Sequence, residues 1–471
     1  MTQTASQEID GLRAVTDGAV IASGEPGFDQ ARRVWNAGID KRPAVIARCT
    51  TARDVAAAIG FAREHGLEVA VRGGAHNTAG TATCDGGVMV DLSLMSEVSV
   101  DPVARRARAG GGALLADLDA ATLAHGLAVP AGLISHTGIG GLTLGGGMGW
   151  LTRKFGLTID NLAAAEVVTA DGQVRRASAT EDPDLFWAIR GGGGNFGVVT
   201  SFDFRLRPVD PTVWFGMFFW GLDQGPEVLR LARELTPALP QDLAIVTAAV
   251  TAPPAPFVPP EYQLTPGYAL LLAGFGTAGR SAETEHAAAV EQIRRQLPPL
   301  FDLVTPMPYV ALQQMLDEAN AWGLYAYEKA AYLQDLTDDV IEVVTGHVAG
   351  KATPQSAVMF YRLDGAYSEV GDGETAFSGG RSPRYAAFML GVTPVAGELP
   401  AARGWVRELW SALGPHAISG GDGYVNGTAE YADERVRGSY GTAKYERLAR
   451  IKAQYDPANL FHLNANIRPA A

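Results

Sequence analysis

The chain has 471 residues, of which 47% are hydrophobic and 19% are charged, so it is long and apolar enough to bury more than one core. Its 38 Lys and Arg residues against 51 Asp and Glu residues give a formal net charge of -13, which argues against a nucleic-acid partner. No apolar run approaches the ~18 residues of a membrane span, and the opening MTQTASQEID lacks the pattern of a secretory leader. We therefore expect a multidomain, cytoplasmic protein with no membrane partner.

The first predicted elements are helices and short strands. Residues 51–66 have the pattern of a helix, with Thr51 as its cap, Asp54 three residues later and Gly66 as its stop. Strands are predicted over residues 67–71, over 88–92 and over 98–109 around a turn at Asp101-Pro102, and a further helix over residues 113–125.

Glycine is concentrated in clusters within the first two hundred residues. It makes up 56 of 471 residues, which is about 12% against a usual value of roughly 7%. The clusters lie at residues 73–74, 110–112, 138–149 and 191–197. Because glycine lets the backbone turn sharply or approach another group closely, the clusters indicate either a bound cofactor or tight packing between elements.

The cluster that follows the predicted strand at 67–71 reads Arg72-Gly73-Gly74-Ala75-His76-Asn77. Consecutive glycine amides directly after a strand can form an anion-binding nest, and Arg72 adds a positive charge beside it. This chemistry suits a pyrophosphate. His76 would then lie near a bound dinucleotide, although a histidine taken alone is more often a surface or structural residue.

Two later clusters favour different structures. Residues 130–149, PAGLISHTGIGGLTLGGGMG, contain too many glycines for a stable helix and are predicted to form a backbone-lined wall, against either a ligand or a packed core. Residues 192–197 satisfy GxGxxG, but a β-branched strand follows in place of a helix, which argues against a nicotinamide Rossmann domain. No GxxxxGK[ST] motif supports a nucleoside triphosphatase.

A domain boundary is predicted near residue 209, where the glycine clusters stop and prolines accumulate. Beyond it, strand-like residues 268–275 and 361–366 alternate with helix-like residues 282–297 and 337–348, a pattern typical of an antiparallel sheet backed by helices. The last fifty residues change character again, with a predicted helix over 443–455.

The sequence offers no metal site. Cys49 and Cys84 are too few for a disulfide framework and lack CxxC spacing, and the eight histidines include no HExxH motif. We expect two plain thiols and no bound metal.

Taken together, the motifs resemble one family. The resemblance rests on the Arg-Gly-Gly-Ala-His-Asn loop, the Pro-Ala-Gly to Gly-Gly-Gly wall, Asp160-Asn161, residues 191–197, and the C-terminal YDPANLF and NANI segments. From about Pro43 to Pro469 the chain resembles the berberine-bridge-enzyme-like branch of the vanillyl-alcohol-oxidase superfold. The resemblance implies an α+β fold with two domains. A PCMH-type FAD-binding domain is formed by two parts, residues 1–209 and 419–471. A substrate-binding domain of antiparallel sheet backed by helices, residues 210–418, is inserted between them.

The same resemblance implies which residues bind FAD. The pyrophosphate would be cradled by Arg72, Gly73, Gly74, Ala75, His76 and Asn77. The flavin would be lined by Gly132, Thr137, Gly138, Gly141 and Gly147, the adenine end would meet the backbone of Val199, and the isoalloxazine would be approached by Asn464 and Asn466.

The chain departs from many relatives at one position. Those relatives attach FAD both through the loop histidine and through a cysteine two residues after Pro-Ala-Gly, where this chain has Ile134. Isoleucine cannot form a thioether. The resemblance therefore implies a single covalent bond, between His76 and the flavin 8α-methyl carbon.

Tyr424, in a Tyr-Val-Asn sequence, resembles the Tyr-x-Asn that supplies the general base in several relatives. A phenol with an ordinary pKa of about 10 is a poor base at neutral pH, so the role requires a nearby positive charge or hydrogen-bond donors. Lys329 is a candidate because the family often places a lysine in that strand, and it is equally a candidate solvated charge. Tyr361 and Tyr367 are the next candidates for the base.

The leading functional hypothesis is an FAD-dependent oxidase that takes a hydride from a small organic substrate, an alcohol, sugar, amine or secondary metabolite, and passes the electrons to molecular oxygen. The alternatives are a flavin dehydrogenase, a redox-neutral cyclase of secondary metabolism, and a non-catalytic small-molecule binding protein. The sequence specifies neither the substrate nor the oligomeric state. The candidate substrate-domain aromatics, which either line a site or fill a core, are Trp322, Tyr325, Tyr327, Tyr361 and Tyr385.

Overall fold

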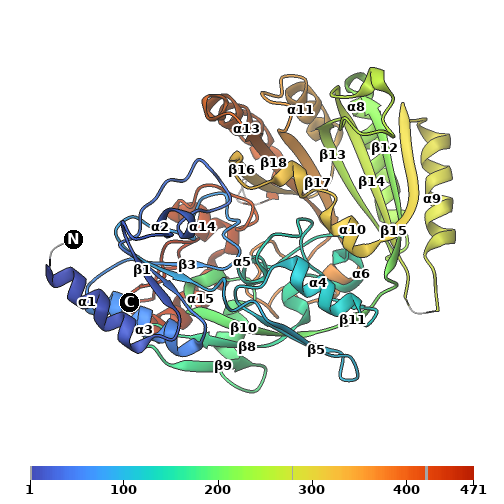
Figure 1. Ribbon diagram of the computed structural model, residues 1–471. Helices are drawn as coiled ribbons and strands as arrows, with labels where there is room; N and C mark the ends of the chain where they lie inside the picture. The colour runs from blue at the N-terminus through green and yellow to red at the C-terminus, as the bar shows by residue number, and fades with distance from the viewer. Residues whose placement is uncertain (1–2, 278, 419–422) are drawn as a thin grey trace.

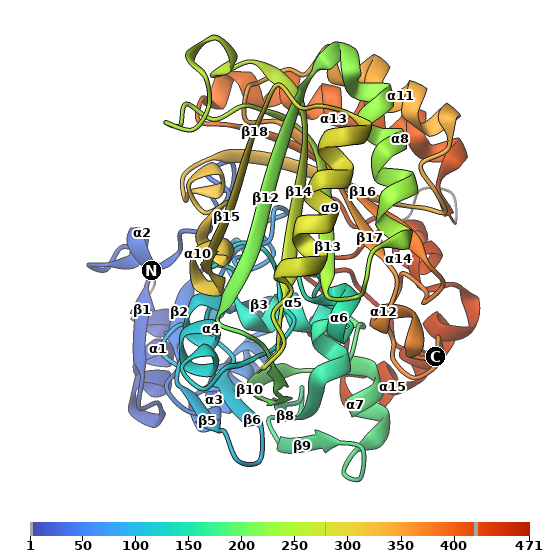
Figure 2. The same cartoon turned by 90° about the vertical axis from the view of Figure 1, so that its right-hand side faces the viewer.

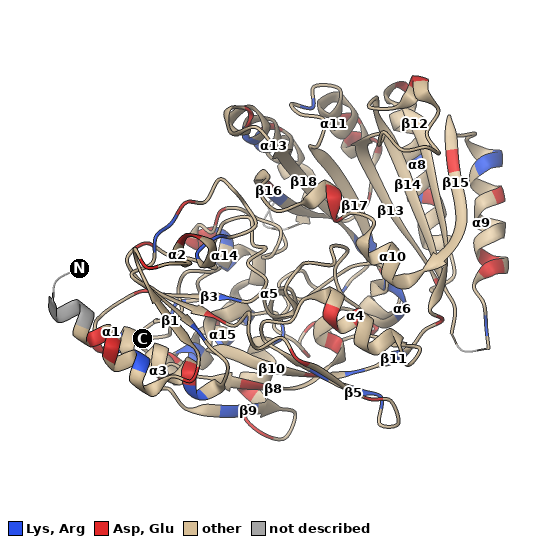
Figure 3. Cartoon of the chain, viewed as in Figure 1, with Lys and Arg blue, Asp and Glu red and all other residues tan. Residues whose placement is uncertain are grey.

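The computed structural model describes residues 3–277, 279–418 and 423–471, and its elements form two parts that meet along one side (Figure 1). Within these residues there are sheets of four, five and seven strands, and a short pair formed by β7 (Leu127–Ala128) and β11 (Arg207–Pro208). Charged side chains are frequent on outer helices such as α9 (Glu283–Gln296) (Figure 3).

The four-stranded sheet lies near the N-terminus. Its strands in spatial order are β1 (Ala19–Ala22), β2 (Val45–Arg48), β4 (Val88–Asp91) and β3 (Val69–Arg72), and the last three run parallel. Helix α3 (Ala52–Glu64) packs its buried Val55, Ile59 and Ala62 into the core of this sheet, with α1 (Gln3–Val15) beside it. A capping box between Thr51 and Asp54 begins α3, which confirms that helix start.

The five-stranded sheet is antiparallel throughout. Its strands in spatial order are β5 (Val98–Asp101), β6 (Arg106–Gly110), β10 (Val198–Arg205), β8 (Leu162–Val168) and β9 (Val174–Ser178). The helices near it are α4 (Leu115–Leu123), α7 (Pro183–Ile189), α14 (Asp433–Tyr440) and α15 (Thr442–Tyr455). Tyr440 and Leu448 of the two C-terminal helices share one hydrophobic core with Phe202 of β10, so both ends of the chain build this part of the fold.

The glycine-rich wall contains a helix that the sequence did not predict. Residues of the wall form α5 (Ile139–Gly145), which is a correction to the expectation that this stretch is too rich in glycine to be helical. Tertiary packing overrides the low propensity, because Ile139 and Leu144 are buried and a Cβ atom at Gly140 would lie only 3.1 Å from the Gly111 carbonyl oxygen. Glycine here lets a helix lie directly on neighbouring backbone.

The seven-stranded sheet is also antiparallel, and helices cover one of its faces (Figure 2). Its strands in spatial order are β15 (Phe301–Pro308), β12 (Thr212–Gly221), β14 (Pro266–Phe275), β13 (Leu243–Thr251), β17 (Ala357–Leu363), β18 (Arg384–Thr393) and β16 (Tyr325–Leu333). The covering helices are α8 (Gly225–Leu235), α9, α11 (Asp338–Val348) and α13 (Leu399–Leu413). The α+β class, with an antiparallel sheet backed by helices, is thus confirmed.

Four short helices lie in segments between strands. They are α2 (Phe28–Ala31), α6 (Thr152–Phe155), α10 (Tyr309–Gln314) and α12 (Ala366–Glu369). The domain limits at residues 209/210 and 418/419 stay a prediction, and residues 419–422, at the second limit, lie outside the described residues.

The register of the last three strands decides which side chains face away from the helices. Phe388 of β18 pairs with Ala330 of β16 on one side and with Met359 of β17 on the other. Glu328 pairs with Leu390, two residues further along the same strands. Because side chains alternate along a strand, all of these residues project from one face, and Lys329 projects from the other.

A buried ion pair fastens the C-terminal segment. The Lys452 ammonium donates hydrogen bonds to the Asp456 carboxylate at 2.7 Å and to the carbonyl oxygens of Asn195 and Phe461 at 2.6 and 2.9 Å, and both charged side chains have 0% exposure. Asp456 also accepts from the backbone N–H of Leu460 and Phe461. The pair therefore holds the chain end against residues 193–195.

Replacing Lys452 by Met tests this fastening. The change leaves the Asp456 carboxylate buried without its cation, which costs about 3–5 kcal/mol in comparable sites, so the urea midpoint of unfolding should fall clearly. The control is Arg230→Ala, which removes an exposed ion pair with Asp338 and should cost less than about 1 kcal/mol. Equal midpoints for the two variants would contradict the role given to Lys452.

Candidate active site

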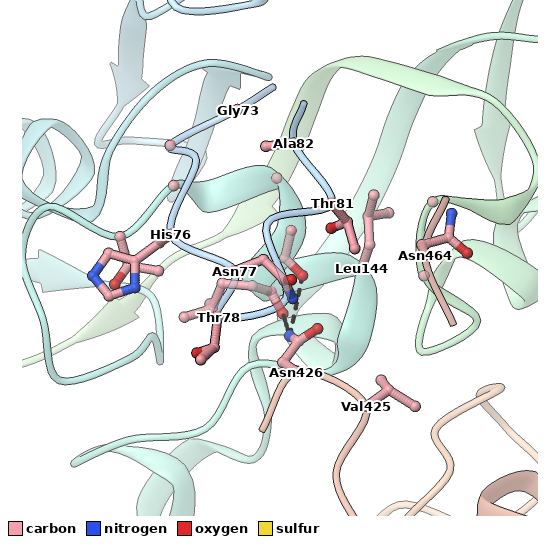
Figure 4. Close-up of a pocket in the computed structure, with 18 of the residues that line it drawn as sticks. Gly73, His76, Asn77, Thr78, Thr81, Ala82, Leu144, Val425, Asn426 and Asn464 are labelled. Atoms are coloured by element: carbon pink, nitrogen blue, oxygen red, sulfur yellow. Dashed lines mark hydrogen bonds between the residues drawn. The ribbon is translucent and has the colours of Figure 1, made fainter. Parts of the chain in front are cut away.

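A cavity of about 390 Å³ opens where the two smaller sheets, the free face of the seven-stranded sheet and the C-terminal segment meet. Figure 4 shows part of its lining, with His76, Asn77 and Thr78 along one loop and Asn426 and Asn464 contributed by the C-terminal segments. The predicted residues that line it are Gly73, Gly74, Ala75, His76, Asn77, Gly132, Thr137, Gly138, Gly141, Val199, Tyr424 and Asn464. The structure therefore brings together residues from five separate stretches of sequence.

Three predicted residues do not line the cavity. The Arg72 guanidinium donates to the Ala31 carbonyl oxygen and lies 3.8 Å from an Asp91 carboxylate oxygen, so it is directed away from the glycine nest. Gly147 instead donates its backbone N–H to the Tyr424 hydroxyl. Asn466 lies in the C-terminal segment behind the lining, with its side-chain oxygen buried and without a hydrogen-bond partner in the described residues.

Two glycines of the lining touch through their backbones. A Cβ atom at Gly74 would lie 2.3 Å from the Gly138 nitrogen, and one at Gly138 would lie 2.2 Å from the Gly74 nitrogen. Side chains are sterically excluded at such distances, so only glycine lets the loop after β3 rest on the start of α5. This contact fixes the loop that carries His76.

His76 lies in an aromatic pocket at the edge of the cavity. Its ring stacks on Trp35 at 4.6 Å between centroids and lies 5.0 Å from His136, and Ala75 before it has a φ of 53°, in the left-handed region that favours glycine. Burial, with a further contribution from His136, lowers the pKa of His76 to about 3. The imidazole is therefore neutral near pH 7, and its buried Nε2 has no hydrogen-bond partner in the described residues.

No sequence pattern identified Trp35 or His136 as neighbours of His76. Trp35 belongs to no motif, and it reaches the site because its backbone N–H donates to the Ala75 carbonyl oxygen at 3.0 Å. His136 lies within the glycine-rich wall, where no spacing distinguishes it from a structural residue.

The Tyr424 hydroxyl is held by neutral donors. Its oxygen accepts the Gly147 backbone N–H at 2.9 Å and the Asn426 side-chain N–H at 3.1 Å, and Asn426 also donates to the carbonyl oxygens of Gly141 and Leu142. Burial raises the pKa of Tyr424 to about 12, and the two N–H donors act in the opposite direction. The predicted hydrogen-bond donors are thus present, and they carry no charge.

Lys329 does not supply the positive charge considered for Tyr424. Its ammonium lies 2.9 Å from a Glu430 carboxylate oxygen and over the rings of Tyr327 and Trp410, on the side of the strand opposite the cavity. The Tyr367 hydroxyl donates to the Gly380 carbonyl oxygen, outside the cavity lining. Of the five candidate substrate-domain aromatics, Tyr361 lines the cavity, whereas Trp322, Tyr325, Tyr327 and Tyr385 do not.

Glu328 is a lining residue that sequence reasoning missed. Its carboxylate oxygen Oε2 accepts a hydrogen bond from the Thr78 hydroxyl at 2.9 Å. Burial raises the pKa of Glu328 to about 7, although the Thr78 hydrogen bond acts to lower it. An isolated glutamate beside a lysine resembles a solvated strand edge in sequence, and only the strand register shows that it faces inward.

The lining fits an extended dinucleotide cofactor such as FAD. A Cβ atom at Gly141 would meet nothing within 4 Å, so the space in front of this backbone belongs to the cavity. Buried polar atoms without partners in the described residues, His76 Nε2 and Asn464 Oδ1, border the same space. Bare backbone and unpaired polar atoms are the features that a flavin and its pyrophosphate can complete.

Comparison with known proteins also indicates an FAD-binding protein. Residues 43–178 match the model of an FAD binding domain, and residues 423–468 match the model described as berberine and berberine like. The chain is 32% identical to (R)-6-hydroxynicotine oxidase of Paenarthrobacter nicotinovorans over 466 residues, which cover 96% of this chain and 97% of that protein.

Solved structures agree with the fold. The structure superposes on 6-hydroxy-D-nicotine oxidase from Arthrobacter nicotinovorans with a TM-score of 0.82 at 28% identity, covering 97% of this chain and 98% of that chain. It superposes on the berberine-bridge-enzyme-like protein 1 of Physcomitrella patens with a TM-score of 0.86 at 21% identity, covering 98% of this chain and 99% of that chain.

Fold, cavity and matches together define an FAD-linked oxidoreductase with a PCMH-type FAD-binding domain. The chain belongs to the berberine-bridge-enzyme-like family, which confirms the resemblance seen in its motifs. In the part of the chain that the structure describes, no helix combines the length and apolar character needed to cross a membrane, and no group of three His, Cys, Asp or Glu residues could hold a metal ion.

Replacing Gly138 by Ala tests the backbone contact. The added methyl group must displace Gly74, and overpacking of this kind costs about 1–3 kcal/mol, so both the thermal midpoint and the ratio of flavin to protein should fall. The control is Gly60→Ala in α3, where a Cβ atom meets nothing within 4 Å and a small gain in stability is expected. A Gly138→Ala protein with full flavin content and an unchanged midpoint would contradict this role.

Proposed function

We propose that the chain is an FAD-dependent oxidase whose flavin is attached by one covalent bond, between a ring nitrogen of His76 and the flavin 8α-methyl carbon. The enzyme takes a hydride from a small organic substrate and passes the electrons to molecular oxygen. The observation that carries the proposal is the neutral His76 imidazole, which is buried at the edge of the cavity with Nε2 unpaired. A neutral imidazole has the lone pair that such a bond requires.

The other residues of the cavity lining support a single attachment. Ile134 lines the cavity and cannot form a thioether, and neither cysteine of the chain belongs to the lining. Burial raises the pKa of the Cys84 thiol to about 11, so this thiol stays protonated at neutral pH.

The proposed binding of FAD uses backbone more than side chains. The amides of Gly73 and Gly74 lie at the end of β3, where they suit the pyrophosphate, and Gly138 and Gly141 present bare helix backbone to the ring system. When bound, FAD supplies the hydride acceptor and the route of electrons to oxygen. Asn464 has an unpaired side-chain oxygen at the same cavity, which suits a polar edge of the isoalloxazine.

We assign the general base to Tyr424. Its hydroxyl lies in the cavity lining between the wall that holds the flavin and the open face of the seven-stranded sheet. The N–H groups of Gly147 and Asn426 stabilise negative charge on its oxygen, which opposes the effect of burial and favours the phenolate. The phenolate is the form of Tyr424 that accepts a substrate proton as the hydride leaves. A similarity of 32% to (R)-6-hydroxynicotine oxidase supports an oxidase rather than a binding protein.

Covalent attachment can be tested without a substrate. Acid precipitation should leave the yellow colour in the protein pellet, and a proteolytic peptide containing His76 should carry one flavin through one bond. The His76→Ala variant should release all of its flavin into the supernatant, whereas His125→Ala, which changes an exposed histidine, should retain it. Flavin found wholly in the wild-type supernatant, or attached at two residues, would contradict the proposal.

The base can be tested once an oxygen-consumption screen of alcohols, sugars, amines and phenols has identified a substrate. Tyr424→Phe should keep covalent FAD and slow anaerobic flavin reduction by a factor of about 100 or more, the usual scale of losing a general base. The matched control is Tyr431→Phe, because Tyr431 is another cavity hydroxyl and donates to the Val425 carbonyl oxygen. Near-normal reduction in the Tyr424→Phe protein would assign the base to another residue.

A further inference from the structure

The part of the cavity formed by the seven-stranded sheet combines one carboxylate with aromatic and aliphatic side chains. Glu328, Tyr361, Phe388 and Leu390 project from the same face of strands β16, β17 and β18 into the lining, joined by Met359. Glu328 is the one carboxylate among the lining residues, and no lysine or arginine of the described chain lines the cavity. A negative charge on Glu328 therefore has no cation to pair with in the lining.

The Glu328 carboxyl has one donor. Thr78 donates to Oε2 at 2.9 Å, and among the described residues no other group donates to the side chain. The oxygen Oε1 is absent from the buried atoms that lack a partner, so it remains accessible from the cavity. A carboxylate with a free oxygen at a cavity wall is placed to bind a ligand.

Aromatic rings surround the same region. Tyr361 and Phe388 meet edge to face with centroids 5.3 Å apart, and Phe388 meets Tyr424 in the same way at 6.1 Å. The Glu328 carboxylate is close enough to raise the pKa of both Tyr361 and Tyr424. Aromatic faces combined with a carboxylate attract a cationic nitrogen, and they give a neutral polyol few side chains to bind.

We propose that Glu328, together with the rings of Tyr361 and Phe388, binds a positively charged nitrogen of the substrate, so that the site selects small amines with an aromatic or apolar body. The inference rests on the proposed function in one respect, that this cavity is the substrate site. It concerns binding and leaves open which carbon of the amine is oxidised.

The charge of Glu328 gives the proposed binding a pH dependence. The other titratable groups of the lining are His76, Tyr361, Tyr424, Tyr431 and Tyr440. Burial lowers the pKa of His76 to about 3 and raises those of the four tyrosines, to about 12 for Tyr424 and Tyr431, so all five are neutral between about pH 5 and 9. Glu328, with a pKa of about 7, is the lining group that changes charge in this range, and it is negative above about pH 7.

The test measures binding to the flavin-loaded protein by calorimetry, with benzyltrimethylammonium as a permanent cation and benzyl alcohol as a neutral probe of similar body. Because neither measurement requires turnover, the result is independent of the tests of His76 and Tyr424. In the unaltered protein, the cation should bind about tenfold more tightly at roughly pH 8.5 than at roughly pH 6, since Glu328 ionises in between. Affinity for benzyl alcohol should stay constant.

Glu328→Gln should weaken binding of the cation at the higher pH by about tenfold or more and should remove the pH dependence of that binding. The affinity for benzyl alcohol should change by less than about twofold. The matched control is Glu318→Gln, an exposed carboxylate near the lining residue Asn320, which should leave both affinities unchanged. Equal losses for both probes, or no loss for the cation, would overturn the proposal. If the Glu328→Gln protein does not fold, the pH series on the unaltered protein is sufficient as a test. An affinity for the cation that does not change with pH would overturn the proposal.

Discussion

The backbone contact between Gly74 and Gly138 is the constraint on which the rest of the site depends. It places the loop after β3 directly on the start of α5, two elements separated by more than sixty residues, without side chains between them. Once α5 is held there, the carbonyl oxygens of Gly141 and Leu142 at its middle accept hydrogen bonds from Asn426. That residue then donates to the Tyr424 hydroxyl, so the contact of two glycines is linked by hydrogen bonds to both the proposed flavin side and the proposed substrate side of the cavity.

The features that could be predicted from the sequence are those that depend on residues close together in the chain. The capping box of Thr51 and Asp54 and the strand that follows Gly197 depend on neighbouring residues, and both are present in the structure. The α5 helix was missed because its stability comes from packing against distant backbone, which propensity does not measure. Arg72 was assigned to the nest by its position in the motif, whereas its guanidinium donates to the Ala31 carbonyl oxygen and lies 3.8 Å from Asp91.

Contacts made between distant segments could not be predicted from their own patterns. Nothing near Trp35 indicates that it stacks on His76, and nothing in the sequence around Glu328 indicates that it faces a cavity instead of solvent. For Glu328 the information lies in the register of β16 against β18, because a shift of one residue would turn the side chain to the other face of the sheet. The family resemblance indicated the glycine and histidine positions because these form motifs, whereas in the strand that contains Glu328 it pointed only to the neighbouring Lys329.

Burial acts on three groups of the cavity with different chemical consequences. It favours the neutral form of His76, disfavours the Tyr424 phenolate against the effect of its two N–H donors, and leaves Glu328 near the midpoint of its titration at neutral pH. The proposed flavin side is formed mainly by backbone, and the proposed substrate side is formed by alternate residues of three strands whose intervening residues pack against helices. Tyr361 and Phe388 therefore lie on elements other than α5 and the loop of His76, whereas Glu328 is joined to that loop through the hydroxyl of Thr78.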